Sequence, residues 1–194
     1  MASQAIANLI ARAVMTTIDT ARKCQAVGLK LIGGETKENV EYLEPYGFTS
    51  AAKAGAEAVV LFPSGDRSHG VAIAVADRRY RLKGLKNGEV ALYTDEGDSI
   101  VLKRDRVIEV TTKQFIVNAE EKISFTSPMF EVSASGSAAF TTPTLTTSGD
   151  FAASGEVSDG VGTMSAMRMT YNGHTHKENG DGGGTTDAPG QSMG

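Results

Sequence analysis

The stretch from residue 106 to about residue 160 constrains the fold most, because its apolar residues are too sparse to build a core within one chain. Thr, Ser, Ala and Gly dominate it, and apolar residues recur singly or in pairs every five to ten positions. The recurring apolar positions include Val110, Phe115, Val117, Ile123, Phe125, Phe130, Val132, Phe140, Leu145 and Phe151. This pattern is typical of short stacked strands.

Each rung of such a stack would complete its interior with the same rung of neighbouring chains. Three chains wrapped about one axis would also cover strand edges that otherwise invite aggregation. We therefore predict an intertwined trimeric β-prism or β-helix over residues 106–163. The alternative is a disordered Ser/Thr/Gly-rich linker, against which the regular placement of Phe and Val argues.

Before this stretch, residues 20–105 carry short apolar runs separated by turn signals such as Gly33-Gly34 and Lys86-Asn87-Gly88. The expected strands are residues 24–31, 38–43, 58–62, 69–75, 90–93 and 99–103. Five or six short strands without intervening helix patterns predict a small OB-like antiparallel barrel.

The first 19 residues predict a helix. Apolar residues at helical spacing form one stripe: Ile6, Leu9, Ile10, Ala13 and Val14. A helix of this length is marginal alone in water, so we expect it to cap the barrel or to bind another chain.

Residues 164–194 form a glycine-rich end that contains His174-Thr175-His176. In an extended strand, residues i and i+2 point to the same face, so both imidazoles can aim at one metal ion. One chain offers only two nitrogens, whereas three symmetry-related chains would offer six. The pair therefore predicts a metal-bound tip on a trimer, in a chain that is otherwise mainly β.

Composition gives no support for nucleic-acid binding, since the formal net charge is −4 and the pI is near 5.4. The basic stretch at residues 77–83 is interpreted as a solvated loop, because the aromatic platform of single-strand binders is missing. The single cysteine, Cys24, excludes an intrachain disulfide. With no run of 18 apolar residues and no secretion-signal layout, we expect a protein that is soluble when made and assembled in a reducing cytosol.

The order of these parts resembles the central tail spikes of contractile-tailed bacteriophages, of the baseplate assembly protein V type, and most closely those of the phage Mu type. The most specific part is Asn172-Gly173-His174-Thr175-His176 with glycines after it. The resemblance implies a homotrimeric, non-enzymatic virion protein at the tip of the tail baseplate, held by a hub protein. Its point would meet the host outer membrane first when the sheath contracts, and the host cytoplasm would be the place of assembly.

The resemblance also implies metals. Two histidines from each of three chains hold a six-coordinate iron ion in this family, which corresponds here to His174 and His176. Calcium is a second expected ion, and Asp187, with Asp181 behind it, is the predicted ligand set because carboxylate oxygens suit a hard cation. The alternative for both aspartates is a solvated turn residue.

Two other functions stay open. One is a trimeric receptor-binding tail fibre. The other is a cell-wall-degrading metallohydrolase that uses His174, His176 and Glu178, although glycine-rich sequence around them offers no core to shape a cleft. Neither a Glu-X-X-His nor a Gly-X-Ser-X-Gly motif occurs. His69 is interpreted as a surface or strand-start residue.

Overall fold

The structure is a computed structural model that describes residues 9–178, 180 and 182–193. The chain divides into two compact units, Met1–Ile123 and Ser124–Gly194.

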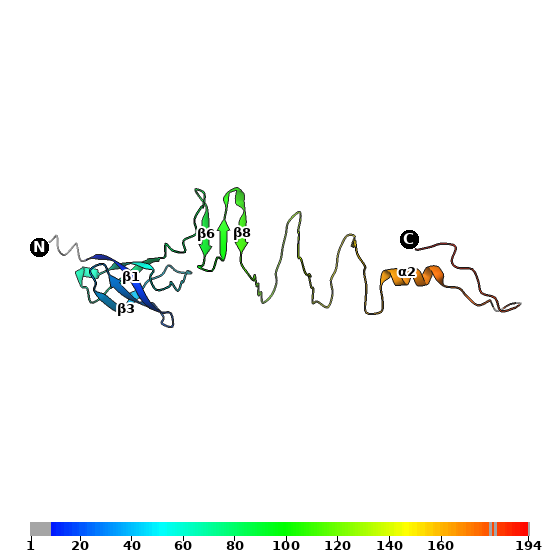
Figure 1. Ribbon diagram of the computed structural model, residues 1–194, viewed down its shortest axis with the longest axis horizontal. Coiled ribbons are helices and arrows are strands. Elements are labelled where there is room, and N and C mark those ends of the chain that lie inside the picture. Colours follow the sequence, from blue (N-terminus) through cyan, green and yellow to red (C-terminus); the bar gives the residue numbers. More distant parts are fainter. Residues whose placement is uncertain (1–8, 179, 181, 194) are drawn as a thin grey trace. The chain divides into compact units, whose positions relative to one another are not determined.

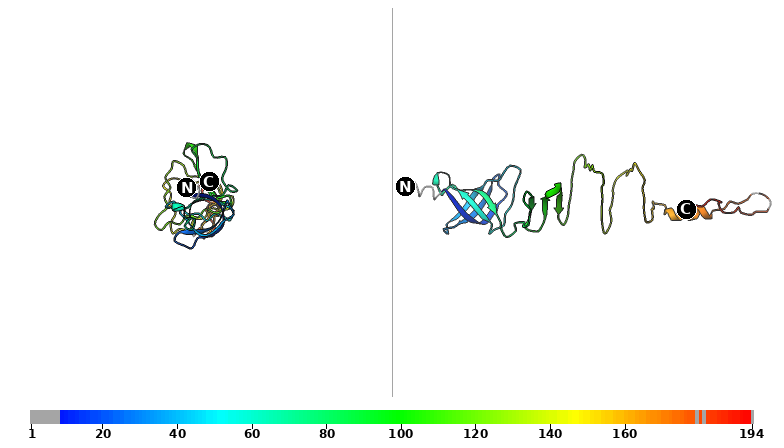
Figure 2. Two further views of the ribbon diagram at one scale, coloured as in Figure 1. Left: turned by 90° about the vertical axis from the view of Figure 1, so that its left-hand side faces the viewer. Right: turned by 90° about the horizontal axis from the view of Figure 1, so that it is seen from above.

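The first unit contains a closed five-stranded barrel (Figures 1 and 2). Its strands are β1 (Ile10–Asp19), β2 (Gln25–Leu31), β3 (Thr36–Tyr42), β4 (Glu57–Leu61) and β5 (Val71–Ala76), in the order β1-β2-β3-β5-β4. Neighbours are antiparallel except β3 and β5, which pair in parallel, and β1 closes the barrel against β4. A short 3-10 turn, η1 (Pro63–Gly65), follows β4. The predicted small barrel is confirmed.

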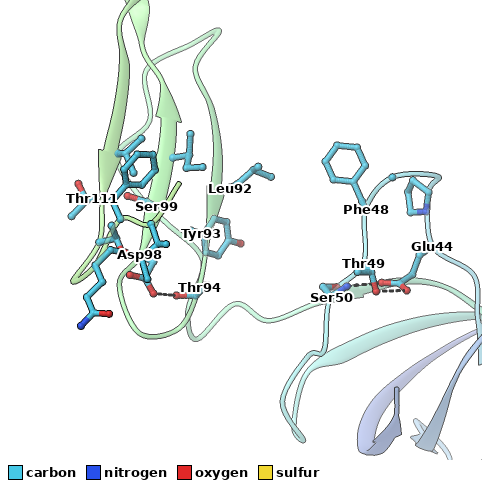
Figure 3. A pocket seen from close by; sticks show the side chains of 18 of the residues that line it. Glu44, Phe48, Thr49, Ser50, Leu92, Tyr93, Thr94, Asp98, Ser99 and Thr111 are labelled. Carbon is cyan, nitrogen blue, oxygen red and sulfur yellow. Dashed lines mark hydrogen bonds between the residues drawn. The ribbon is translucent and has the colours of Figure 1, made fainter. Parts of the chain in front are cut away.

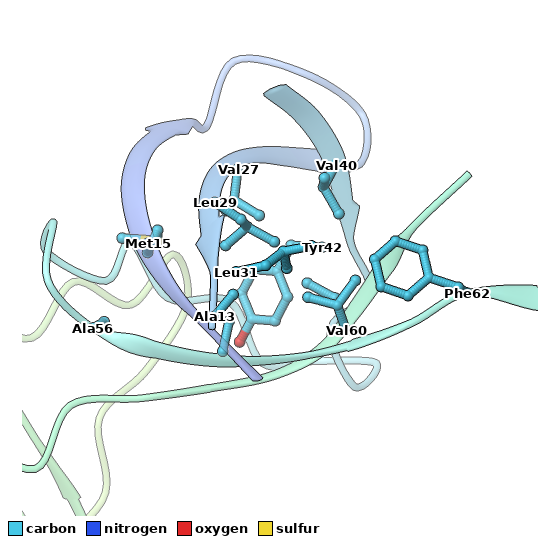
Figure 4. Packing of buried hydrophobic residues seen from close by; sticks show 12 residues of the cluster. Ala13, Met15, Val27, Leu29, Leu31, Val40, Tyr42, Ala56, Val60 and Phe62 are labelled. Carbon is cyan, nitrogen blue, oxygen red and sulfur yellow. The ribbon is translucent and has the colours of Figure 1, made fainter. Parts of the chain in front are cut away.

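The barrel interior is a complete hydrophobic core (Figure 4). Its largest fully buried side chains are Phe62, Met15, Leu29, Val27 and Val60. They come from β1, β2, β4 and the residue after β4, so the core joins strands that are distant in sequence. One chain is therefore sufficient to bury this part of the molecule.

The predicted N-terminal helix is wrong for the described residues, because β1 begins at Ile10. Ala13 and Met15 point into the core with the period of two that belongs to a strand, whereas Val14 is exposed. Strand β1 is paired on both sides, with β2 and with β4, and this pairing overrides the helical spacing of the apolar residues. Ile6 lies outside the described residues.

A second sheet holds β6 (Val90–Tyr93), β7 (Ser99–Leu102) and β8 (Ile108–Thr111) in an antiparallel meander. The turn η2 (Arg104–Arg106) connects the last two strands. The strands at residues 90–93 and 99–103 were expected in the barrel, and the structure corrects this. β1 takes the place beside β4 that closes the barrel, so the later strands form a sheet of their own.

This second sheet has one uniformly aliphatic face. The register pairs Val90 with Leu102, Leu92 with Ile100, Ile100 with Val110 and Leu102 with Ile108. Alternation along each strand then puts the six side chains on the same face. All six are exposed, and Ile108 is 68% accessible. We call these six residues the aliphatic face.

Residues 112–157 contain no strand, and every residue from 102 to 156 is exposed. Phe125, Phe130, Phe140 and Phe151 are each 68–74% accessible, although Phe125 and Phe130 stack with ring centroids 5.5 Å apart. Figure 1 shows the ribbon in this region turning back and forth without pairing to itself. The predicted interchain prism remains a prediction.

The helix α2 (Met164–Gly173) lies in the second unit and was not expected from the sequence. Among the described residues, no helix is long and apolar enough to cross a membrane.

Candidate metal-binding tip

The two histidines of the predicted metal site lie directly after α2, where His174 is the C-cap residue. Its backbone is extended, at φ −73° and ψ 145°, so the chain leaves the helix at once. The two imidazole centroids are 5.1 Å apart and the rings are nearly perpendicular, at 87°. The structure thus brings His174 and His176 together, as their spacing predicts.

His174 is fixed by the helix end. Its Nδ1 lies 2.6 Å from the backbone oxygen of Tyr171, and its backbone N donates to the same oxygen over 3.4 Å. A carbonyl oxygen can only accept, so Nδ1 carries the proton and Nε2 presents its lone pair. A metal-binding histidine that donates its other N–H to a backbone carbonyl is the usual arrangement.

His176 is held through its backbone by a segment ten residues further along. Its N donates to Thr186 Oγ1 over 2.9 Å, and Thr186 N donates to the His176 oxygen over 2.8 Å. The next contact along the same pair of segments is Glu178 N to the Gly184 oxygen, at 3.0 Å. Between them, Lys177 and Thr185 form an isolated β-bridge.

The N-terminus of α2 is held by side chains. Thr163 Oγ1 accepts from Ala166 N over 3.1 Å, which caps the helix. Glu156 accepts from the Ser165 hydroxyl at 2.5 Å and from Ser165 N at 3.2 Å. These hydrogen bonds lower the pKa of Glu156.

The chain end near Met193 returns to α2. Asn172 Nδ2 donates to the Met193 oxygen over 3.2 Å, and Met193 N donates to Asn172 Oδ1 over 2.8 Å. This two-bond contact closes the chain segment between residues 172 and 193 at its base.

Of the two predicted calcium ligands, the structure describes only Asp187. Asp187 is exposed, and Asp181 lies outside the described residues. No group of three or more His, Cys, Asp or Glu side chains that could hold a metal occurs among the described residues. His174 and His176 of one chain therefore offer a two-nitrogen donor set, and imidazole nitrogen is a ligand that suits transition metals.

The remaining candidate residues, His69 and Cys24, make hydrogen bonds within the first unit. His69 is exposed beside Asp66, and hydrogen bonds from Ser68 and His69 lower the pKa of Asp66 to about 2. The Cys24 thiol is half-buried and lies 3.4 Å from the Tyr42 oxygen. Neither residue is part of a ligand cluster among the described residues.

Two of the four basic side chains at residues 77–83 are ion-paired. Arg79 contacts Asp77 at 2.6 Å, and Arg78 contacts Glu57 at 2.7 Å. These carboxylates compete with a phosphate backbone for the two guanidinium groups.

A hollow of about 1000 Å³ lies in the first unit (Figure 3). Phe48, Leu92 and Tyr93 are among its apolar walls. Of the carboxylates in its lining, Glu44 accepts from Ser50 N at 2.7 Å and Asp98 accepts from Thr94 Oγ1 at 3.2 Å. Both serve local turns, and the lining residues include no histidine or cysteine to act as a general base or nucleophile.

Residues 12–79, which make up most of the barrel and its connections, match the family Bacteriophage Mu Gp45, N-terminal. This part of the chain is similar to the N-terminal domain of phage Mu Gp45. The resemblance to Mu-type spikes that the sequence indicates is thereby confirmed.

Two curated relatives extend the match. The baseplate puncturing device gp45 of Escherichia phage Mu is 36% identical over 115 residues, which is 59% of this chain and 58% of that protein. The Mu-like prophage FluMu protein gp45 of Haemophilus influenzae is 35% identical over 112 residues, 58% of this chain and 61% of that protein. The chain spans about three fifths of the length of these relatives.

Proposed function

We propose that this protein is the central spike of a contractile phage tail baseplate and that it pierces the host outer membrane. The observation that supports this most is the match of residues 12–79 to the Mu Gp45 N-terminal family, together with 36% identity to a baseplate puncturing device. The role is structural rather than enzymatic: the spike delivers the force of sheath contraction to a small area. The proposed partners are two further copies of the chain, a baseplate hub protein and the host outer membrane, with no nucleic acid.

The proposed homotrimer is supported by apolar surface that one chain leaves uncovered. The aliphatic face of the second sheet and the phenylalanines of residues 112–157 are all exposed in the single chain. Burying one such side chain fully contributes about 1.5–3 kcal/mol. Further copies of the chain can cover these side chains, because every copy carries the same exposed apolar residues.

The proposed shaft, residues 106–163, also needs partners for its backbone. From residue 112 to residue 157 no strand pairs within the chain, so these N–H and C=O groups form no ladder of their own. Interchain pairing would satisfy them and would resist peeling under load, because many hydrogen bonds would have to break together.

At the proposed tip, residues 164–194, His174 and His176 from three chains would supply six imidazole nitrogens. Six nitrogens favour an octahedral ion such as iron over tetrahedral zinc. Bound there, the ion would supply crosslinking energy where the shaft has no further rung. Calcium held by Asp187 remains a separate proposal.

Sedimentation of the purified chain combined with elemental analysis tests this function. The expected species has three times the 20.3 kDa chain mass and about one transition metal per three chains. A monomer without transition metal would refute the trimeric spike.

Leakage from lipopolysaccharide-containing vesicles, when the spike is driven against them, tests piercing separately. Specific affinity for one glycan without leakage would favour the receptor-binding fibre. Clearing of peptidoglycan by the purified protein would favour the hydrolase.

A further inference from the structure

We infer that Thr186 is a positioning residue for the histidine pair, acting through the backbone of His176. The inference rests on the proposed metal role of His174 and His176. It concerns a residue outside the histidine motif, ten positions after His176 in the chain.

The contact between the two residues is reciprocal. Thr186 Oγ1 accepts from His176 N at 2.9 Å, and Thr186 N donates to the His176 oxygen at 2.8 Å. The peptide groups on both sides of the His176 Cα are thus tied to one residue. Since the direction of the Cα–Cβ bond follows the backbone, this contact fixes the direction in which the His176 side chain leaves the backbone.

His174 has a different support, and the two must agree. The α2 end fixes His174 through the Tyr171 oxygen, at 2.6 Å from Nδ1. The structure places the His176 ring 5.1 Å from that of His174. For both imidazoles to reach one ion, the backbones of His174 and His176 must keep their relative orientation. Thr186 is the residue that holds the His176 backbone.

The surrounding chain cannot do this by itself. Beyond the bridge of Lys177 and Thr185, the loop contains Gly182 and Gly183 at positive φ, 130° and 73°. These two glycines carry no side chain that could hold the backbone of His176. The half-buried Thr186 supplies both hydrogen bonds to that backbone instead.

The test compares Thr186→Val, which removes the accepting oxygen and keeps the shape, with Thr186→Ser, which keeps the hydroxyl. Co²⁺ is the probe, added to the full-length metal-free protein against a competing chelator. Loss of an outer partner of a metal ligand typically weakens binding about 10–100-fold, which is the change expected for Thr186→Val. Thr186→Ser should restore the affinity and the visible spectrum of the bound Co²⁺.

Thr185→Val is the matched control, because the bridge of Thr185 to Lys177 is made by the backbone. Amide hydrogen exchange at His176 in the metal-free protein provides a readout independent of metal. It should accelerate in Thr186→Val and in Thr186→Ala, and stay slow in Thr186→Ser and in Thr185→Val.

The outcomes separate the inference from the function that it rests on. If Thr186→Val and Thr186→Ala bind Co²⁺ as tightly as the unmodified protein, the positioning role is refuted while the metal site stands. If the unmodified protein binds no Co²⁺, the proposed metal role fails and the inference fails with it. Sedimentation of each variant shows whether it still assembles. If only one of Thr186→Val and Thr186→Ala assembles, the Co²⁺ affinity of that variant decides.

Discussion

Truncating Ile108 to Ala should weaken assembly without weakening the single chain. Ile108 lies at the end of the aliphatic face and is 68% accessible, so the chain alone has buried only about a third of it. Full burial of an Ile contributes about 1.5–3 kcal/mol, which leaves about 1–2 kcal/mol per chain to be gained between chains. Three chains gain about 3–6 kcal/mol, and Ala retains part of it. A loss of about 2–4 kcal/mol corresponds to a trimer dissociation constant raised about 30- to 700-fold.

Sedimentation equilibrium across a dilution series measures this constant, and thermal unfolding at high dilution measures the single chain. Glu109→Gln is the matched control, since Glu109 follows Ile108 in β8 and points to the opposite face. Its contact with Lys103, at 2.6 Å, is between exposed groups and contributes little. If Ile108→Ala assembles as tightly as Glu109→Gln, the aliphatic face is not an interface between copies.

Three further predictions follow from other parts of the chain. Phe62→Ala should lower the free energy of unfolding of the barrel by about 3–5 kcal/mol in a denaturant titration, because it empties a fully buried site; a loss below 1 kcal/mol would contradict the core described above. Replacing His174 and His176 by Ala together should abolish bound transition metal in elemental analysis while trimers persist, and stoichiometric metal in that variant would refute imidazole ligation. Hydrogen bonds lower the pKa of Glu156, so the stability that its carboxylate gives to α2 should be fully present at pH values above the ordinary glutamate pKa. This stability should be lost as the pH falls through the lowered pKa. Exchange at the Ser165 amide should follow that loss, and in Glu156→Gln it should show no such pH step.

The positions of most strands after residue 20 could be predicted because turn chemistry delimits them. Residues 90–93 agree with β6, and the strands expected at 24–31 and 58–62 lie within one residue of β2 and β4. Gly, Pro and Asn end these runs for local reasons that need no tertiary information.

β1 could not be predicted in the same way, because its apolar residues satisfy helical spacing as well as alternation. Only pairing with both β2 and β4 decides between the two, and these contacts are distant in sequence. α2 was missed for a related reason. Its Met-rich residues follow the cap Thr163 but lie in a segment whose glycines dominate the composition.

The histidine pair shows the same division between local and distant information. The nearness of His174 and His176 follows from their spacing, whereas the hydrogen bonds of His176 to Thr186 depend on how a glycine-rich loop returns. Asp187 adjoins Thr186 in sequence, and nothing in the residue type distinguishes a ligand from a solvated carboxylate there.

The contrast between the barrel and the rest of the chain sets an order for folding and assembly. The barrel buries Phe62, Met15 and Leu29 completely within one chain, so its hydrophobic free energy is available before any partner arrives. Residues 112–157 gain almost nothing alone, because their side chains stay exposed and their backbone forms no strand. Ordering them costs about 1–2 kcal/mol per residue in backbone entropy, which only contacts between chains can offset. Folding of the barrel would therefore come first and be independent of concentration. In the proposed trimer, ordering of residues 112–157 would be coupled to association, and the histidine pairs of the three chains would meet last.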